Sequence, residues 1–251
     1  MGKGGDAVGE LIAVLSGKGG TGKTTVCAGI ATALAEAGLR VLCIDCDVGL
    51  RNLDISLGLS QVSALSFVDV AQGGYDLEQA AVHPQFPKLR FLTAPVNCQA
   101  DAVDQAAFRM LLTQAKSQFH YVFLDAPAGI DAGFRLAAQF ADRVLLVTGP
   151  DPASVRDASR AGEMLELMKK KNVRLIVNRI NKKMVSAMGM TIDDVMDKAG
   201  LPLLGIVPED PNVVLSAAFG KPLLQQTRRG AGAACRRIAK RIQGLKTAIS
   251  L

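Results

Sequence analysis

The sequence is poor in histidine and lacks long apolar runs. Its two histidines are His83, which precedes a proline, and His120, which opens an apolar run, so catalysis by histidine is not expected. No apolar stretch reaches the roughly 18 residues of a membrane-spanning helix, and the N-terminus lacks the apolar segment of a secretory signal. These absences lead us to expect a cytoplasmic protein.

Cysteines are few and scattered, and their number, five, is odd. Cys27, Cys43 and Cys46 fall in strand-like or helical patterns, which favours buried reduced thiols over disulfides. The spacing of Cys43 and Cys46 is one that metal and redox sites use, but on a strand the two side chains point to opposite faces, and no second pair follows. We therefore expect no metal or redox role for them.

The sequence also lacks an internal repeat, a low-complexity tract and a linker rich in Pro, Gly or Ser. With 49% hydrophobic residues, we expect residues 1–251 to form a single domain around one core. Apolar runs alternate with helical patterns, which is typical of a three-layer, doubly wound, mostly parallel sheet with helices on both faces. The predicted strands are 11–15, 40–44, 89–93, 121–124, 143–147, 173–177 and 203–207.

A glycine-rich loop follows the first of these runs. Residues 17–24 match the phosphate-loop pattern G-x-x-x-x-G-K-[ST] and precede an alanine-rich stretch that ends at Gly38. The motif requires this order of strand, loop and helix, because glycine backbone and a helix N-terminus then surround the phosphates. Lys23 is expected on the β- and γ-phosphates and Thr24 on Mg²⁺. The expected nucleotide contacts in the loop are Gly17, Gly19, Gly20, Thr21, Gly22, Lys23 and Thr24.

Acidic side chains follow two other predicted strands. Asp45 and Asp47 come directly after 40–44, where a carboxylate can face bound phosphates and an attacking water. Asp125 follows 121–124 as the candidate Walker B ligand of Mg²⁺, and the N–H of Gly129 in the next loop is a candidate sensor of the γ-phosphate. A single aspartate at a strand end is more often a helix cap, but together with the phosphate loop these residues favour a nucleotide site.

Two later strand ends are candidates for binding the base. Asn178 and Arg179 follow 173–177, and the Asn178 amide carries the donor and acceptor that a purine edge requires. Pro208 and Asp210 lie in a rigid loop after 203–207 that can form a wall against the base. The expected site therefore lies along the carboxyl edge of the sheet.

Several of these motifs match one family. Residues 18–25, Lys-Gly-Gly-Thr-Gly-Lys-Thr-Thr, resemble the deviant Walker A motif of the family of P-loop ATPases that includes ParA, MinD and nitrogenase iron protein. Residues 45–54, 125–130, 154–157 and 207–211 resemble signatures of its MinD branch, the septum-site-determining ATPases, more than those of flagellar-number or chromosome-partition members. The resemblance runs from about residue 11 to about residue 243. An iron–sulfur carrier would need clustered cysteines near the C-terminus, where Cys235 stands alone.

The resemblance implies roles that the residues alone leave open. It implies that ATP and Mg²⁺ are the cofactors, and that Lys18 contacts the phosphates of a partner subunit, so that hydrolysis depends on an ATP-bound homodimer. Asp47 is implied to position the attacking water, which makes Lys18, Lys23 and Asp47 the catalytic residues. The implied Mg²⁺ and phosphate contacts beyond these are Thr24, Thr25, Asp45 and Asp125.

The C-terminal part, residues 230–251, is predicted to form a basic amphipathic helix. Its apolar face carries Ile238, Ile242, Leu245 and Ile249, and its basic residues are Arg236, Arg237, Lys240, Arg241 and Lys246. With a formal net charge of +6 on the chain, such a helix suits an anionic membrane surface, but the same pattern is typical of a helix packed on a core. Relatives usually continue into a separate membrane-targeting segment, and Gly244 weakens the helix, so both interpretations stay open.

Two classes of function follow from these features. In the first, the protein is an ATPase that dimerises on ATP, associates reversibly with the inner face of the cell membrane and positions the septum by recruiting a division inhibitor, under a topological regulator of the Min type. In the second, it is a DNA- or cargo-positioning ATPase whose basic helix binds phosphate backbones without reading sequence. Residues 49–54 favour the first class and make DNA the less favoured partner, while the second class stays open as the alternative.

Overall fold

The computed structural model describes residues 8–48, 50–96 and 102–250. Their strands form one eight-stranded sheet whose neighbours run parallel, except for an antiparallel strand at one edge. From one edge to the other the strands are β3 (Ala81–Val82), β4 (Leu89–Leu92), β2 (Val41–Asp45), β5 (Tyr121–Asp125), β1 (Glu10–Leu15), β6 (Arg143–Thr148), β7 (Val173–Ile180) and β8 (Leu203–Pro208).

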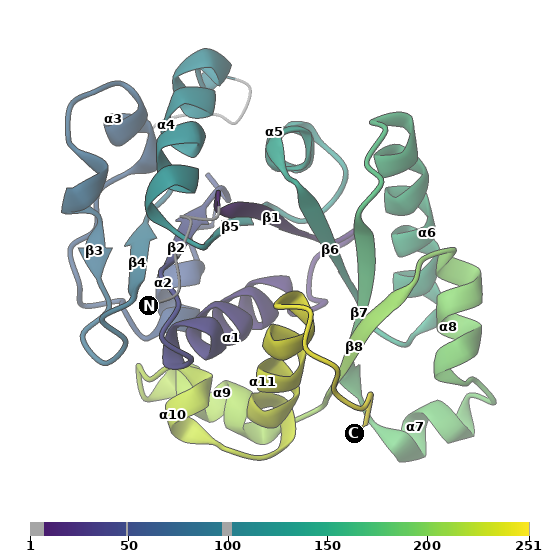
Figure 1. The fold of residues 1–251 in the computed structure, drawn as a ribbon. Coiled ribbons are helices and arrows are strands. Elements are labelled where there is room, and N and C mark those ends of the chain that lie inside the picture. The colour runs from purple at the N-terminus through teal and green to yellow at the C-terminus, as the bar shows by residue number, and fades with distance from the viewer. Residues whose placement is uncertain (1–7, 49, 97–101, 251) are drawn as a thin grey trace, which may run out of the picture.

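Helices cover both faces of the sheet, as predicted for a three-layer, doubly wound fold (Figure 1). One face carries α1 (Lys23–Glu36), α2 (Leu53–Leu57), α9 (Pro211–Ala218), α10 (Leu223–Gln226) and α11 (Gly230–Ile242). The other carries α3 (Phe67–Ala71), α4 (Gln105–Gln118), α5 (Ala132–Phe140), α6 (Pro152–Leu167), α7 (Lys182–Ala187), α8 (Ile192–Ala199) and the 3₁₀ turn η1 (Leu77–Gln79).

The inner positions of the central strands are apolar on both faces of the sheet, because helices bury both faces. β2 is buried at every position, and β1 is buried from Leu11 onward. Each of the seven apolar runs in the sequence is a strand in the structure. The sequence did not predict β3, because two residues are too few to show a period; it pairs antiparallel with β4 at the edge of the sheet.

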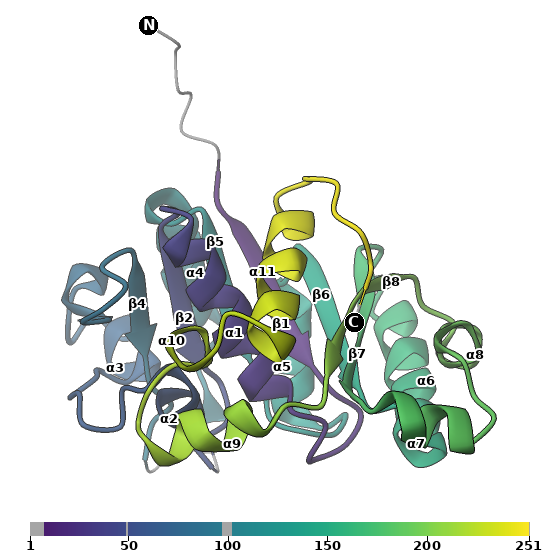
Figure 2. The same cartoon turned by 90° about the horizontal axis from the view of Figure 1, so that it is seen from below.

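Helices α1 and α11 lie side by side against the middle of the sheet (Figure 2). Small residues allow this contact: a Cβ at Gly29 of α1 would come within 2.6 Å of the Cys235 Sγ of α11. Gly38, with φ 86°, follows the end of α1, where its N–H bonds to the carbonyl of Ala35, as its predicted capping role requires. The close contact at Gly29 therefore holds α11 against α1, the helix that follows the phosphate loop.

The expectation of a helix as far as residue 251 is wrong beyond Ile242. Gly244 has φ 81°, which turns the chain back along α11, and Arg237 and Arg241 donate hydrogen bonds to backbone carbonyls of residues 247–250. These side chains supply the partners that helical N–H groups would otherwise provide. Ile238 and Ile242 are buried, whereas residues 243–250 form no helix. Among the described residues, no helix is long and apolar enough to cross the bilayer.

Cysteines and histidines occupy structural positions. Four cysteines are free and buried, as predicted: Cys27, Cys43, Cys46 and Cys235. Cys98, Gly49 and Leu251 lie outside the described residues, within which no cluster of metal-ligating side chains is found. The ring of buried His83 bonds to the Leu57 carbonyl at 2.9 Å, and burial lowers its pKa. His120 Nδ1 accepts the N–H of Arg40 at 2.9 Å.

Candidate functional site

The phosphate loop joins the end of β1 to the start of α1 at the carboxyl edge of the sheet. Gly20 and Gly22 have φ of 80° and 83°, in the left-handed region that glycine adopts without strain. A Cβ at Gly17 would meet the backbone oxygen of Asp157 at 2.2 Å, so the loop lies directly against α6. A Cβ at Gly19 would find only Ala128, at 4.0 Å. The loop is thus packed on one side and open on the other, as an anion cradle requires.

A buried ion pair lies at the base of the loop. Lys23 Nζ is 2.6 Å from Asp125 Oδ1 at the end of β5 and 3.1 Å from the Thr24 hydroxyl. Lys23 is 6% exposed and Asp125 is 1% exposed. Asp125 Oδ2 and the hydroxyl oxygen of Thr21 are buried here, and neither has a hydrogen-bond partner among the described residues. Such atoms are expected to gain a partner when a ligand binds.

Asp45 lies beside Asp125 because β2 and β5 pair in register there. Its Oδ1 accepts the N–H of Asp47 at 2.9 Å, and its Oδ2 accepts the N–H of Leu53 at 3.2 Å. Burial, together with the charge of Asp125, raises the pKa of Asp45 to about 7. Burial also raises the pKa of Asp125, although Lys23 opposes this shift. A divalent cation beside these carboxylates would favour their ionised forms.

The residues present fit a complex of Mg²⁺ with a nucleotide. Asp125 offers an unpartnered carboxylate oxygen, and the Thr24 hydroxyl lies close by on the first turn of α1. Oxygen ligands of this kind are those that Mg²⁺ prefers, alongside water and phosphate. Asp47, half-buried just beyond β2, accepts the N–H of Leu50 at 3.2 Å. The predicted phosphate and metal residues therefore come together at one end of the sheet.

The raised pKa of Asp45 predicts a pH effect on the stability of the protein without nucleotide. Its carboxyl stays protonated in the folded state up to about pH 7, whereas its ordinary pKa is 3.8. The folded state therefore binds more protons between these values, and this group costs stability as pH rises through that window. Between pH 3.8 and about 7, the unfolding free energy of Asp45→Asn minus that of wild type should rise by up to about 1.4 kcal/mol per pH unit. Above this range the difference should stay constant. Urea unfolding across this range in EDTA measures it, and a pH-independent difference would contradict it.

Lys18 lies apart from the Lys23 and Asp125 pair. Its Nζ is 3.6 Å from Oδ1 of Asp151, the residue that caps α6, and its side chain is 38% exposed. Although partial burial opposes the shift, hydrogen bonds from Ser154 hold the pKa of Asp151 below its ordinary value, and Lys18 adds to this. The early lysine thus faces its own α6 and remains accessible from outside.

The backbone N–H of Gly129, predicted to sense a γ-phosphate, is engaged in this structure. It donates to the carbonyl of Ser16 at 3.1 Å, and Gly129 has φ 94°. The N–H is therefore not free to meet a phosphate in this conformation. A sensing role would require this hydrogen bond to break first.

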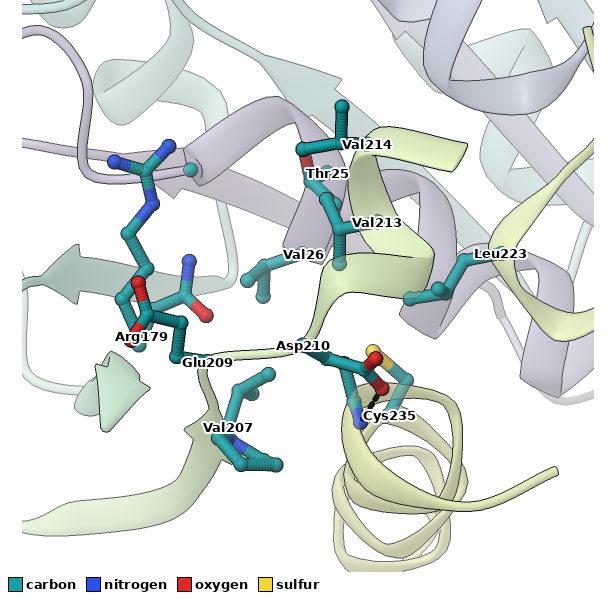
Figure 3. A pocket seen from close by; sticks show the side chains of 14 residues that line it. Thr25, Val26, Arg179, Val207, Glu209, Asp210, Val213, Val214, Leu223 and Cys235 are labelled. Atoms are coloured by element: carbon teal, nitrogen blue, oxygen red, sulfur yellow. Dashed lines mark hydrogen bonds between the residues drawn. The ribbon is translucent and has the colours of Figure 1, made fainter. Parts of the chain in front are cut away.

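A pocket of about 270 Å³ opens beside the phosphate loop (Figure 3). Thr25 and Val26 of α1 line it together with Val213 and Val214 of α9, all four of which Figure 3 labels. Pro208 and Asp210 are in its lining, as is Cys235 from α11. Apolar walls with a few polar groups are typical of a site for a planar base.

Asn178 and Arg179 also line this pocket. One of the two N–H groups of the Asn178 Nδ2 donates to the carbonyl of Thr21 at 2.7 Å, which fixes the amide and leaves its other N–H and its Oδ1 for a base. A Cβ at Gly22 would meet Nδ2 at 2.3 Å, and glycine is therefore required there. Arg179, with φ 58°, is exposed.

Sequence reasoning missed several residues of the site. Asp151 precedes a proline that starts α6, a helix-start pattern visible in the sequence, but nothing local links it to Lys18. Leu223, Ala231 and Cys235 line the pocket from α10 and α11, far along the chain from the phosphate loop. The packing of α10 and α11 on α1 brings them there.

Comparisons with known proteins agree with this geometry. Residues 12–223 match the family model described as the CobQ/CobB/MinD/ParA nucleotide binding domain. The septum site-determining protein MinD of Synechocystis sp. is 39% identical over 94% of this chain and 90% of its own, and that of Bacillus subtilis is 39% identical over 94% and 90%.

Solved structures agree as well. The chain is similar to MinD in the MinC:MinD cell division protein complex of Aquifex aeolicus, with a TM-score of 0.89 and 35% identity over 96% of this chain and 98% of that one. MinD from Pyrococcus horikoshii, solved with Mg-ADP, gives a TM-score of 0.80 and 29% identity over 93% and 95%. The chain belongs to the ParA/MinD family of P-loop ATPases, in its septum-site-determining MinD branch.

Proposed function

We propose that the protein is a switch that dimerises on ATP, associates with an anionic membrane surface and positions the division septum by recruiting a division inhibitor. One observation carries this proposal. A complete set of candidate hydrolytic residues, Lys23, Asp47 and Asp125, is accompanied by a second lysine, Lys18, that is directed away from them toward Asp151. A lysine so placed suits the phosphates of a second subunit.

The chain's own residues bind and orient the nucleotide. The glycine backbone of the loop and Lys23 hold the phosphates, with Thr24 and Asp125 as the ligands of Mg²⁺ and Asp45 behind them. When bound, Mg²⁺ neutralises phosphate charge. Asp47 orients the attacking water, and the bond from its N–H to Asp45 fixes the backbone that carries it.

The Asn178 amide suits an adenine edge. One N–H of its NH₂ group donates to the Thr21 carbonyl, which leaves the second N–H and Oδ1 at the pocket. This donor and acceptor pair matches the ring nitrogen and the exocyclic amino group of adenine. This supports ATP as the nucleotide.

Dimerisation would bring Lys18 from Asp151 to the phosphates of the partner subunit. There its charge would offset the negative charge that develops during transfer to water, which ties hydrolysis to the dimer. Loss of the γ-phosphate would release the loop around Gly129, and with it the dimer.

Membrane association is assigned to the C-terminal segment, residues 243–250, which follows α11. Leu245 and Ile249 are 53% and 49% exposed, and Lys240 and Lys246 are exposed nearby. Apolar side chains flanked by lysines suit an anionic lipid surface. A single segment of this size binds weakly, but two on one ATP-bound dimer add avidity, which makes binding depend on ATP.

The partner proposed is a division inhibitor of the MinC type, because the relative from Aquifex aeolicus was solved as a MinC:MinD complex. A topological regulator of the Min type is proposed with it. The alternative, a DNA-positioning ATPase, is less well supported by α11. Arg236 pairs with Glu36 at 2.6 Å, and Arg237 and Arg241 donate to backbone carbonyls of the C-terminal segment, so these guanidinium groups are already engaged.

Co-sedimentation with vesicles that contain anionic lipid tests this function. The protein should pellet with vesicles in Mg-ATP and remain in solution in Mg-ADP, and Ile249→Glu should abolish pelleting. Met110→Glu, which changes a 72% exposed side chain on α4, is the matched control and should pellet like wild type. Pelleting that does not depend on the nucleotide would contradict the proposal, and ATP-dependent binding to duplex DNA in a parallel sample would favour the alternative.

A further inference from the structure

One carboxylate joins two helices at the edge of the base pocket. Asp210 caps α9, where its Oδ1 accepts the N–H of Asn212 at 2.9 Å and the Asn212 side-chain amide at 2.8 Å. Its Oδ2 accepts the N–H of Ala231, on the first turn of α11, at 2.9 Å, and Figure 3 shows this bond as a dashed line. Asp210 therefore satisfies N-terminal donors of both helices.

Helix α11 depends on this external cap. Its own capping residue, Arg229, makes no capping hydrogen bond from its side chain. Gly230 has φ 51°, and a Cβ there would come within 2.2 Å of Asp210 Oδ2. The close approach of the carboxylate to α11 therefore requires glycine at this position.

The helices held by Asp210 are two walls of the pocket. Val213 of α9 lines one side, and Ala231 and Cys235 of α11 line another. The phosphate loop, by contrast, is held by α1, by Asp157 of α6 and by Asn178. Two walls that face a base thus share a support, Asp210, that does not hold the phosphate loop.

We propose that Asp210 is a positioning residue for the base half of the nucleotide site, acting by capping α9 and α11 together. This inference rests on the proposed function, since it requires that the pocket hold the base of ATP. The affinity for nucleotides, which carry a base, therefore depends on Asp210, whereas the affinity for ligands that consist only of phosphates does not. By thermodynamic linkage, binding of a base in turn stabilises the first turn of α11.

The test compares ATP with inorganic tripolyphosphate, which has the phosphates and no base. Isothermal titration with Mg²⁺ should give a Kd for ATP raised about tenfold in Asp210→Asn, because an amide can satisfy the donors of only one helix. The Kd for tripolyphosphate should change less than about twofold. Gly230→Ala, which displaces the same carboxylate, should reproduce this pattern, and the double variant should be no worse than the stronger single one.

Asp104→Ala is the matched control, because Asp104 caps α4 through the N–H groups of Ala106 and Ala107. It should leave both Kd values unchanged. Hydrogen exchange of residues 231–235 should slow on adding ATP to wild type and not on adding tripolyphosphate. Equal weakening of both ligands in Asp210→Asn, or weakening of neither, would overturn the inference while ATP binding by wild type leaves the proposed function intact. A wild type that binds ATP no better than tripolyphosphate would overturn the base pocket itself.

Discussion

Lys18→Ala protein is expected to bind ATP within a few-fold of the wild-type affinity and to hydrolyse it about a thousandfold more slowly. ATP binding should change little because Lys18 lies beside Asp151 in a single subunit, where Lys23 is the lysine placed to contact the phosphates. Hydrolysis should slow strongly because a positively charged side chain from a partner subunit raises the rate of phosphoryl transfer by a large factor, as arginine fingers do. Steady-state phosphate release as a function of protein concentration measures this effect.

The wild-type rate per subunit should rise with protein concentration, whereas the rate of Lys18→Ala should not. Lys116→Ala is the matched control, because Lys116 also forms an ion pair, with Asp142 at 2.7 Å, and its loss removes the same charge. It should behave as wild type. A Lys18→Ala variant with the wild-type rate and concentration dependence would remove this lysine from the mechanism.

Asp47→Ala is expected to lower the rate of hydrolysis by about 10²–10⁴-fold and to trap the ATP-bound dimer. Asp47 follows β2 and is held through the hydrogen bond from its N–H to the buried Asp45, so its carboxylate is placed by a rigid strand. Replacing the side chain leaves the phosphate loop and Lys23 unchanged. Single-turnover hydrolysis of bound ATP, with dimer lifetime followed in parallel, measures both effects.

Asp54→Ala serves as the control for Asp47→Ala. Asp54 lies on α2, a few residues further along, and its side chain accepts the local N–H of Ile55 at 2.7 Å. This variant should hydrolyse ATP at the wild-type rate. Unchanged turnover in Asp47→Ala would instead show that another group orients the water.

The fold was largely predictable because its signals are local. The central parallel strands are apolar on both faces, and the backbone of the phosphate loop requires its glycines, so both leave patterns within a few residues. Asp45 and Asp125 could be predicted to meet, since the carboxyl ends of neighbouring parallel strands share one edge.

What the sequence did not reveal depends on contacts between distant segments. Asn178 bonds to Thr21, and Asp210 bonds to Ala231, and no spacing rule predicts either partner. The end of α11 at Ile242 is another case, because the apolar period continues to Ile249. There, Gly244 and the carbonyls held by Arg241 outweigh the helical pattern.

In the proposed cycle, the γ-phosphate of ATP switches the protein from monomer to dimer. Light scattering of the wild-type chain, eluted from a sizing column in Mg-ATP and in Mg-ADP, tests it most directly. The account predicts about twice the 26.4 kDa mass of the chain in ATP and the single mass in ADP. The same mass in both nucleotides would contradict it.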